Sequence, residues 1–285
     1  MSRPLLDSWT TGSRERLKYL FTFLALLLIG TIWYMNDIQP DNLQKEISNL
    51  APIDFFETPW LYAGLLVFTG SFPLIFGFIP RLKFYKQWGY VLLANLPVTV
   101  FFIAWDIYFT QKGVWGFSSA YTTGPHLFNL PWEECLFFVI IPSACTFIYW
   151  SLNSVLSREP FQRSQHTISI LLIVVLCSIG LWKWEHIYTS TATLLCGLFL
   201  LFHVLFIPAR YRGRFYLAYV ISCIPFLIVN GILTGGFTKG PVVMYNPEEY
   251  FGLRVGTVPV DDFAYSFLML FANITLFEAF RKGKE

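Results

Sequence analysis

Two pairs of adjacent carboxylic acids stand out in a chain that otherwise carries few charges. Glu133 and Glu134 lie in the stretch LPWEECLFF, and Asp261 and Asp262 lie in the stretch TVPVDDFAYSF. Each pair opens an apolar run, where an ionised carboxylate is costly. Burial and like charge favour protonation of one or more of these groups, and a neutral acid beside a carboxylate forms an acid/base pair. The pairs therefore indicate proton-transfer chemistry in an apolar setting.

The same residues also suit a purely structural role at the start of a helix. Proline followed by acidic residues is typical of a helix N-terminus, because acidic side chains complement the partial positive charge there. Asn129 and Thr257 are suitable capping residues just upstream. Two copies of the pattern at matching positions favour the chemical interpretation over this one.

The composition indicates a membrane protein. The chain has 285 residues, of which 55% are hydrophobic and 13% charged, against about 25% charged in soluble domains. A span needs roughly 20 apolar residues, and the first run is expected to be a retained span because no cleavage pattern follows it. We predict an all-α polytopic membrane protein with eight transmembrane helices, near 17–35, 60–80, 88–108, 131–151, 166–185, 189–208, 215–234 and 259–280.

Basic residues alternate between the two sides of the predicted membrane. Of 20 lysines and arginines, one side receives only Lys45, Lys112, Lys183, Lys239 and Arg254. Because basic loops face the cytoplasm, both termini are expected there and both acidic pairs at the outer end of the bundle. The net charge of +2 reflects this asymmetry, so a lipid bilayer is expected as a partner and nucleic acid is not.

The second half of the chain repeats the first at one constant offset, without a gap. Pro97 falls on Pro225, Phe109-Thr110 on Phe237-Thr238, Pro131 on Pro259, and Glu133-Glu134 on Asp261-Asp262. The repeat unit is three spans with an extra helix before it, and the two units share one orientation because they start four spans apart. Parallel repeats of this kind are related by an axis along the membrane normal, so the two acidic pairs can converge on one cavity.

This repeat predicts four segments. They are an N-terminal helix and outer loop (1–56), a first repeat (57–151), a linker helix (152–187) and a second repeat (188–281). The long connections 109–130 and 235–258 are rich in Gly, Thr and aromatic residues. They either fold over the mouth of the cavity or serve as ordinary connectors.

The residues around the acidic pairs suggest the kind of substrate. Aromatic faces stabilise cations, so an acid, a base and aromatic walls suit carbocation chemistry on an apolar polyene. The aromatic residues that flank the pairs include Trp132, Phe137, Phe138 and Tyr265. The sequence contains no GxGxxG, Walker, HExxH or GxSxG motif, and neither a cofactor nor a metal is expected.

Two stretches resemble the lycopene cyclase family found in some bacteria, archaea and fungi. They are WDIYFTQKGVWGF with PWEECLFF, and NGILTGGFTKGPVVMYN with GLRVGTVPVDDFAYSF. The family has two homologous units, separate or fused, so two units in one chain imply a complete site with no obligatory partner subunit. The implied activity is non-redox cyclisation of an end group of lycopene, or a similar C40 polyene, to a β-ionone ring. The flavin-dependent cyclases are a separate family with a dinucleotide-binding fingerprint, which this sequence lacks.

The resemblance implies that Glu133, Glu134, Asp261 and Asp262 form the acid/base set. The second pair of the family usually begins with Glu, so Asp261 is one methylene shorter. Adjacent helical residues diverge by about 100°, and we expect Glu134 and Asp262 to face the cavity while Glu133 and Asp261 tune them. Which residue is the acid and which the base stays open.

Three further residues are weaker candidates for the site. Asp106 and Asn230 resemble polar positions of the family, although a helix-end residue and an interhelical hydrogen bond explain them equally well. Arg254 either pairs with an acidic pair and holds it ionised or is a plain loop charge.

Other functions fit part of the same pattern. A proton- or cation-coupled transporter also uses intramembrane carboxylates, but it would place them near the middle of the bilayer. A carotenoid hydratase would capture the same cation with water. A carotenoid-binding subunit without activity would share the fold.

Overall fold

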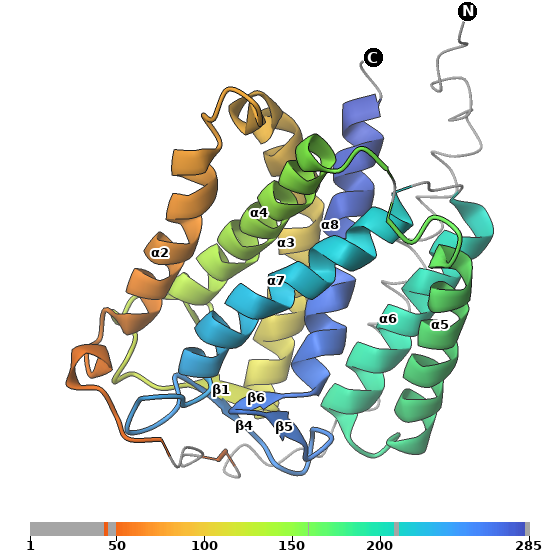
Figure 1. Ribbon diagram of the computed structural model, residues 1–285. Helices are drawn as coiled ribbons and strands as arrows, with labels where there is room; N and C mark the ends of the chain where they lie inside the picture. Colours follow the sequence, from red (N-terminus) through yellow and green to blue (C-terminus); the bar gives the residue numbers. More distant parts are fainter. Residues whose placement is uncertain (1–42, 45–49, 159, 208–210, 283–285) are drawn as a thin grey trace, which may run out of the picture.

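The computed structural model describes residues 43–44, 50–158, 160–207 and 211–282. Long helices lie side by side, and short strands gather at one end of them (Figure 1). The helices are α2 (Leu61–Phe76), α3 (Trp88–Gln111), α4 (Trp132–Val155), α5 (Gln165–Trp182), α6 (Ile187–Phe206), α7 (Arg212–Leu233) and α8 (Asp261–Lys282), with short 3-10 helices η2 (Asp54–Phe56) and η3 (Phe84–Gln87). The described part of the chain is therefore mostly helical, as the apolar runs predict.

Six of these helices, α3 to α8, are long and apolar enough to cross a membrane, which is compatible with a multi-pass membrane protein. Helix α2 has 16 residues and is about 24 Å long at 1.5 Å per residue, shorter than a hydrocarbon core of about 30 Å. It ends where the amide of Gly77 bonds to the carbonyl of Pro73. The predicted span 17–35 lies outside the described residues, so the prediction of eight spans is not confirmed.

Helices α4 and α8 hold the bundle together. Helix α4 packs against α2, α3, α7 and α8, and α8 also packs against α3 and α6, while α5 packs on α6. Aromatic rings fill the core between them: Phe215 stacks on Phe271 with ring centres 4.6 Å apart, and Phe102 stacks on Trp105 at 5.7 Å. This packing brings both helices that begin with an acidic pair to the centre.

Short strands lie at the end where α4 and α8 begin (Figure 1). They are β1 (Trp115–Phe117), β2 (His126–Leu127), β3 (Leu130–Pro131), β4 (Val243–Tyr245), β5 (Arg254–Val255) and β6 (Val258–Pro259). Strands β2 and β3 form a hairpin directly before α4, and β5 and β6 form one directly before α8. The first three strands begin at 115, 126 and 130, and their counterparts begin at 243, 254 and 258. This is the same offset that carries Pro97 to Pro225.

The two long connections pair with each other. Strands β1 and β4 are antiparallel, with Gly116 opposite Met244, and these two residues are also related by the repeat offset. The carbonyl of Val242 accepts from the amide of Ser118 just beyond the strands. The connections therefore form one structure across the strand end of the bundle.

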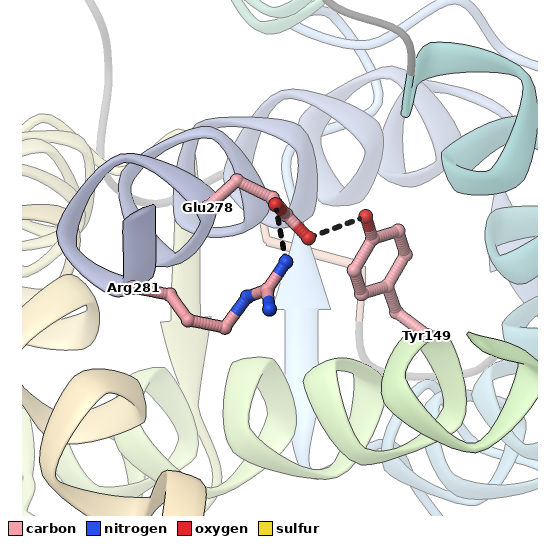
Figure 2. A network of polar contacts seen from close by, with 3 residues as sticks. All are labelled: Tyr149, Glu278 and Arg281. Carbon is pink, nitrogen blue, oxygen red and sulfur yellow. Dashed lines mark hydrogen bonds and ion pairs between the residues drawn. The ribbon is translucent and has the colours of Figure 1, made fainter. Parts of the chain in front are cut away.

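A polar network ties α4 to α8 near the opposite end of the helices. Figure 2 shows Glu278, which is 3% exposed, between Tyr149 and Arg281. The hydroxyl of Tyr149 donates to Oε1 of Glu278 at 2.8 Å, and Nη2 of Arg281 lies 3.0 Å from Oε2. A buried carboxylate needs such partners, so this network fixes the relative position of the two helices that carry the acidic pairs.

Replacing Tyr149 by Phe removes one hydrogen bond to a buried carboxylate without changing the packed ring. We expect Tyr149→Phe to lower stability by about 1–2 kcal/mol, which corresponds to a fall of about 2–4 °C in Tm. Thermal unfolding of the purified protein in detergent measures this. The control is Tyr85→Phe, at an exposed tyrosine whose hydroxyl has no partner among the described residues. An equal effect of both substitutions would contradict the assigned role.

Candidate active site

A cavity of about 350 Å³ lies among α2, α4, α7 and α8 and reaches the strand end of the bundle. Its volume is within the range of about 300–1,000 Å³ usual for small-molecule sites. Most of the lining is apolar, but it includes three carboxylic acids, Asp106, Glu134 and Asp262. No Lys, Arg or His occurs among the described residues that line it. The cavity is therefore an apolar chamber with several acids and no basic side chain in its described wall.

The first acidic pair divides between the cavity and the loop before it. Glu134 lines the cavity, and its Oε2 accepts a hydrogen bond of 2.5 Å from the hydroxyl of Tyr62 on α2. Glu133 is fully buried and turns the other way. Its Oε1 accepts from the amide of Thr123 at 2.8 Å and from the hydroxyl of Thr123 at 2.7 Å. Glu133 thus anchors the connection 109–130 to the start of α4.

The second acidic pair divides in the same way. Asp262 lines the cavity, whereas Asp261 does not. Asp261 accepts a hydrogen bond of 2.5 Å from the hydroxyl of Thr189 on α6 and bonds of 3.2 Å from the amide of Phe251. It therefore anchors the connection 235–258, as Glu133 anchors the other.

Asp262 receives more hydrogen bonds than Glu134. The hydroxyl of Tyr188 donates to Oδ1 at 2.6 Å, and Nδ2 of Asn230 donates to Oδ2 at 2.7 Å. The hydroxyl of Tyr245 lies 3.1 Å from Oδ1 and 2.9 Å from Oδ2. Burial, followed by the neighbouring Asp262, raises the pKa of Tyr245 well above its usual value, so Tyr245 stays protonated and keeps its donor at neutral pH.

The tyrosine donors are the residues that sequence reasoning missed. Tyr62 and Tyr188 are each the second residue of their helices, α2 and α6. Their separation is two residues shorter than the offset that relates Glu134 to Asp262, so an ungapped comparison of the two halves does not align them. A gap of two residues would have revealed the match. Tyr245 gave no such signal, because its contact with Asp262 depends on the pairing of β1 with β4.

Asp106 is a third acid in the same cavity. It is 2% exposed, and its Oδ1 accepts a hydrogen bond from the indole Nε1 of Trp115, while Oδ2 has no partner among the described residues. Trp115 also contacts the rings of Tyr188 and Tyr265, with centres 5.0 and 6.1 Å away. Aromatic faces therefore surround the acids on the side where the two connections pair.

The predicted substrate-binding residues separate into two groups. Phe137, Tyr265, Asp106 and Asn230 line the cavity, whereas Trp132, Phe138 and Arg254 do not. Phe138 lies one turn after Glu134 but packs into the core beside Phe102 and is 1% exposed. The indole of Trp132 donates to the hydroxyl of Thr123 at 2.6 Å, on the loop side of α4.

Arg254 lies behind the second acidic pair rather than beside it. Its guanidinium stacks over Tyr250 and Tyr245, with distances of 4.8 and 5.5 Å to the ring centres. It donates to the hydroxyl of Tyr250 and to the carbonyl of Thr257. Within the described structure Arg254 forms no ion pair with either acidic pair, so of the two alternatives for Arg254 direct pairing is not observed. Its contact with Asp262 runs through Tyr245.

The contacts of Asn129 and Thr257 differ from the capping bonds that their positions suggest. Helix α4 has no side-chain cap. Nδ2 of Asn129 donates to the carbonyl of Ile107 at 2.8 Å, and the hydroxyl of Thr257 donates to the carbonyl of Gly231 at 2.7 Å. Both side chains instead tie the turn of a hairpin to the end of the preceding helix.

Because Glu133 anchors a loop, its substitution should act on structure first. We expect Glu133→Ala to lose two hydrogen bonds, destabilising the protein by about 1–3 kcal/mol, and to increase amide exchange in residues 118–128. Hydrogen exchange with mass spectrometry in detergent measures this. Glu134→Gln is the matched comparison, since Gln can still accept the bond from Tyr62. Faster exchange of the loop in Glu134→Gln than in Glu133→Ala would contradict this assignment.

Comparison with known proteins identifies the family. The sequence model described as lycopene cyclase matches residues 59–152 and 185–280. A bifunctional lycopene cyclase/phytoene synthase of Neurospora crassa is 28% identical over 141 residues, which are 46% of this chain and 23% of that protein. Another protein of the same name, from Pyrenophora tritici-repentis, is 33% identical over 85 residues, or 30% of this chain and 13% of that protein. The matches thus span less than a quarter of these relatives, and no solved structure matches significantly. With two matched segments that together cover more than half of its length, this chain belongs to the lycopene cyclase family.

Proposed function

We propose that this protein is a lycopene β-cyclase that converts a linear end group of a C40 polyene to a β-ionone ring within the membrane. Family membership supports a carotenoid cyclase. The observation that carries the finer proposal is that Glu134 and Asp262, from the two halves of the chain, line one apolar cavity. An acid and a base in one water-poor chamber are what a proton-initiated cyclisation needs.

The proposed reaction is an isomerisation in which protons balance. An acid gives a proton to C2 of the end group, and the C1 cation is captured by the electron pair of the C5–C6 double bond, which forms the C1–C6 bond. A base then takes the proton from C6. No oxidant or reductant is consumed, and the substrate and product have the same mass.

The hydrogen bonds divide the two roles between the acids. Asp262 accepts bonds from three side chains, Tyr188, Asn230 and Tyr245, and such donors stabilise a carboxylate. Glu134 accepts one, from Tyr62. We assign Glu134 as the acid that protonates C2 and Asp262 as the base that accepts the proton from C6, with Glu133 and Asp261 as positioning residues.

The aromatic rings beside the acids suit the cation formed between the two proton transfers. Tyr265 and Trp115 line the cavity together with Tyr188. A ring face stabilises a cation by about 0.5–2 kcal/mol. In the same setting Asp106, held by Trp115, adds a further acidic group on the Glu134 side, and Asn230 orients Asp262. Because the described wall carries no basic side chain, these acids are free to stabilise the positive charge of the substrate.

The proposal includes the internal repeat and its orientation. Segments 57–151 and 188–281 are taken as two parallel units, preceded by 1–56 and 152–187. The common offset between β1–β3 and β4–β6 supports this, as does the antiparallel pairing centred on Gly116 and Met244, which a two-fold axis would produce. The distribution of basic residues supports an orientation with the acidic pairs at the outer end and both termini in the cytoplasm.

Removing either reacting acid should abolish cyclisation. We expect Glu134→Gln and Asp262→Asn each to lower the rate at least about 100-fold, the usual contribution of a general acid or base. Expression in a lycopene-accumulating bacterium, with chromatography and mass spectrometry of the pigments, measures this. Glu248→Gln, at an exposed loop acid, is the matched control and should convert lycopene like the native chain.

The product mass separates the alternatives. A new pigment of unchanged mass with β-ring absorption supports the cyclase. A gain of one water indicates a hydratase, and unchanged lycopene in membranes that contain the protein rejects both. In that last case a transporter or a carotenoid-binding protein becomes the function to test.

The two tyrosine donors should differ in importance. Tyr62→Phe leaves Glu134 without its hydrogen bond, whereas Tyr188→Phe leaves Asp262 with two other donors. We expect a loss of about tenfold in rate for Tyr62→Phe, equivalent to one hydrogen bond of about 1.4 kcal/mol, and a few-fold loss for Tyr188→Phe. Initial rates of cyclisation in membrane preparations compare them. A larger effect of Tyr188→Phe would reverse the assigned difference.

A further inference from the structure

The cavity continues far beyond the acids, along one face of α4. Its lining residues on that helix lie mostly three or four positions apart: Glu134, Phe137, Ile141, Ala144, Cys145, Phe147 and Ile148. From Glu134 to Ile148 the helix rises about 21 Å at 1.5 Å per residue. Among these α4 residues Glu134, at the strand end, is an acid. The lining residues that follow it along α4 are apolar apart from the thiol of Cys145. The chamber is therefore an elongated slot with its chemistry at one end.

The slot opens sideways between α2 and α7. Helix α4 packs against both and forms the floor. Phe68 and Phe72 on α2 and Ile228 on α7 line the slot and are at the same time exposed, by 54%, 43% and 56%. In a membrane these residues face hydrocarbon. The strand end is covered instead, since Trp115 and Tyr245 of the paired connections line the slot there and are buried.

The corresponding face of α8 has no opening to the side in the described structure, although Met269 on this face lines the cavity. The repeat offset carries Ile141, Cys145 and Ile148 to Met269, Asn273 and Leu276. These three are 1%, 0% and 5% exposed, and Nδ2 of Asn273 donates to the hydroxyl of Thr146 on α4. Within the described residues the lateral opening is therefore on α4 and has no equivalent on α8.

We propose that the slot on α4, open between α2 and α7, binds the linear isoprenoid chain of the substrate while one end group lies among the acids. This inference rests on the proposed function and assigns the chain-binding part of the same site. The occupant is an extended, unbranched-backbone polyene, because the slot is long, apolar and open to the hydrocarbon from which such a molecule enters. An extended C40 chain is longer than the slot, so its far end leaves through the lateral opening.

Blocking the slot midway tests this. Ala144 lies on the floor about 15 Å along α4 from Glu134, so Ala144→Trp places an indole in the path of the chain without touching the acids. Ala104→Trp is the matched control, because Ala104 is exposed on α3 and does not line the slot. Ala144→Leu adds a smaller obstacle at the same place and guards against a folding defect of the larger side chain.

Two measurements are made on each variant. The first is the amount of lycopene that co-purifies with the protein in mild detergent, read from the ratio of pigment to protein absorption. The second is cyclisation of lycopene and of a C20 polyene that carries the same end group at one terminus and ends before Ala144. We expect Ala144→Trp to lower lycopene retention and cyclisation by about tenfold, the cost of an overfilled site, with a smaller fall for Ala144→Leu. Conversion of the C20 polyene and all values for Ala104→Trp should stay near those of the native chain.

The outcomes separate the slot from the reaction. Unchanged lycopene retention in Ala144→Trp overturns the slot whether or not the native chain is a cyclase. Equal loss of the C40 and C20 reactions also overturns it, because a block confined to the chain would spare the short substrate. A third outcome is that the native chain converts neither polyene while Ala144→Trp retains less lycopene than the native chain. This outcome supports the slot and rejects the cyclase.

Discussion

The constraint on which this structure depends is the burial of carboxylic acids in an apolar chamber that has no basic residue in its described wall. A buried polar oxygen without a partner is costly. Most of the polar groups around the acids are hydrogen-bond donors that supply such partners. Helices α2 and α6 each have a tyrosine in the first turn whose hydroxyl donates to an acid. Tyr62 donates to Glu134 on α4, and Tyr188 donates to Asp262 on α8. The paired connections deliver Tyr245 to Asp262 and Trp115 to Asp106. Hydrogen bonds rather than ion pairs therefore stabilise the acids, and no basic side chain in the described wall neutralises them.

The same constraint explains why acidic residues occur in pairs. One acid in each pair faces the cavity, and the other accepts backbone and hydroxyl donors from the connection that precedes its helix: Glu133 from Thr123, and Asp261 from Phe251. The acid that lines the cavity and the anchor of the preceding connection are thus adjacent in sequence. A displacement of the connection should therefore move the cavity-lining acid as well, because the anchor and this acid lie in the first turn of the same helix.

Sequence reasoning reached the helices and the central acids but not the contacts between distant segments. Hydropathy located α2 to α8 because a spanning helix satisfies its own backbone and leaves a long apolar run. The internal repeat singled out the two acidic pairs, and the angle of about 100° between adjacent helical residues favoured Glu134 and Asp262 as the members that face the cavity. The same ungapped alignment hid Tyr62 and Tyr188, which are out of register by two residues. Phe138 was misplaced because a helical face is wider than one cavity, and the rotation that buries Phe138 beside Phe102 depends on α3.

The two halves of the site are similar but not identical, and the proposed cyclase would need this asymmetry to act on one end group in one chamber. Each half contributes an acid, a tyrosine and a covering strand, yet the donors number one at Glu134 and three at Asp262. The face of α4 is open to the side, while the matching face of α8 is filled by Asn273 and its neighbours. A symmetrical pair of acids would compete for the same proton, and a symmetrical pair of openings would admit two chains to one chamber. For the proposed cyclase, divergence of two similar halves would therefore supply both a direction for the proton and a single path for the chain.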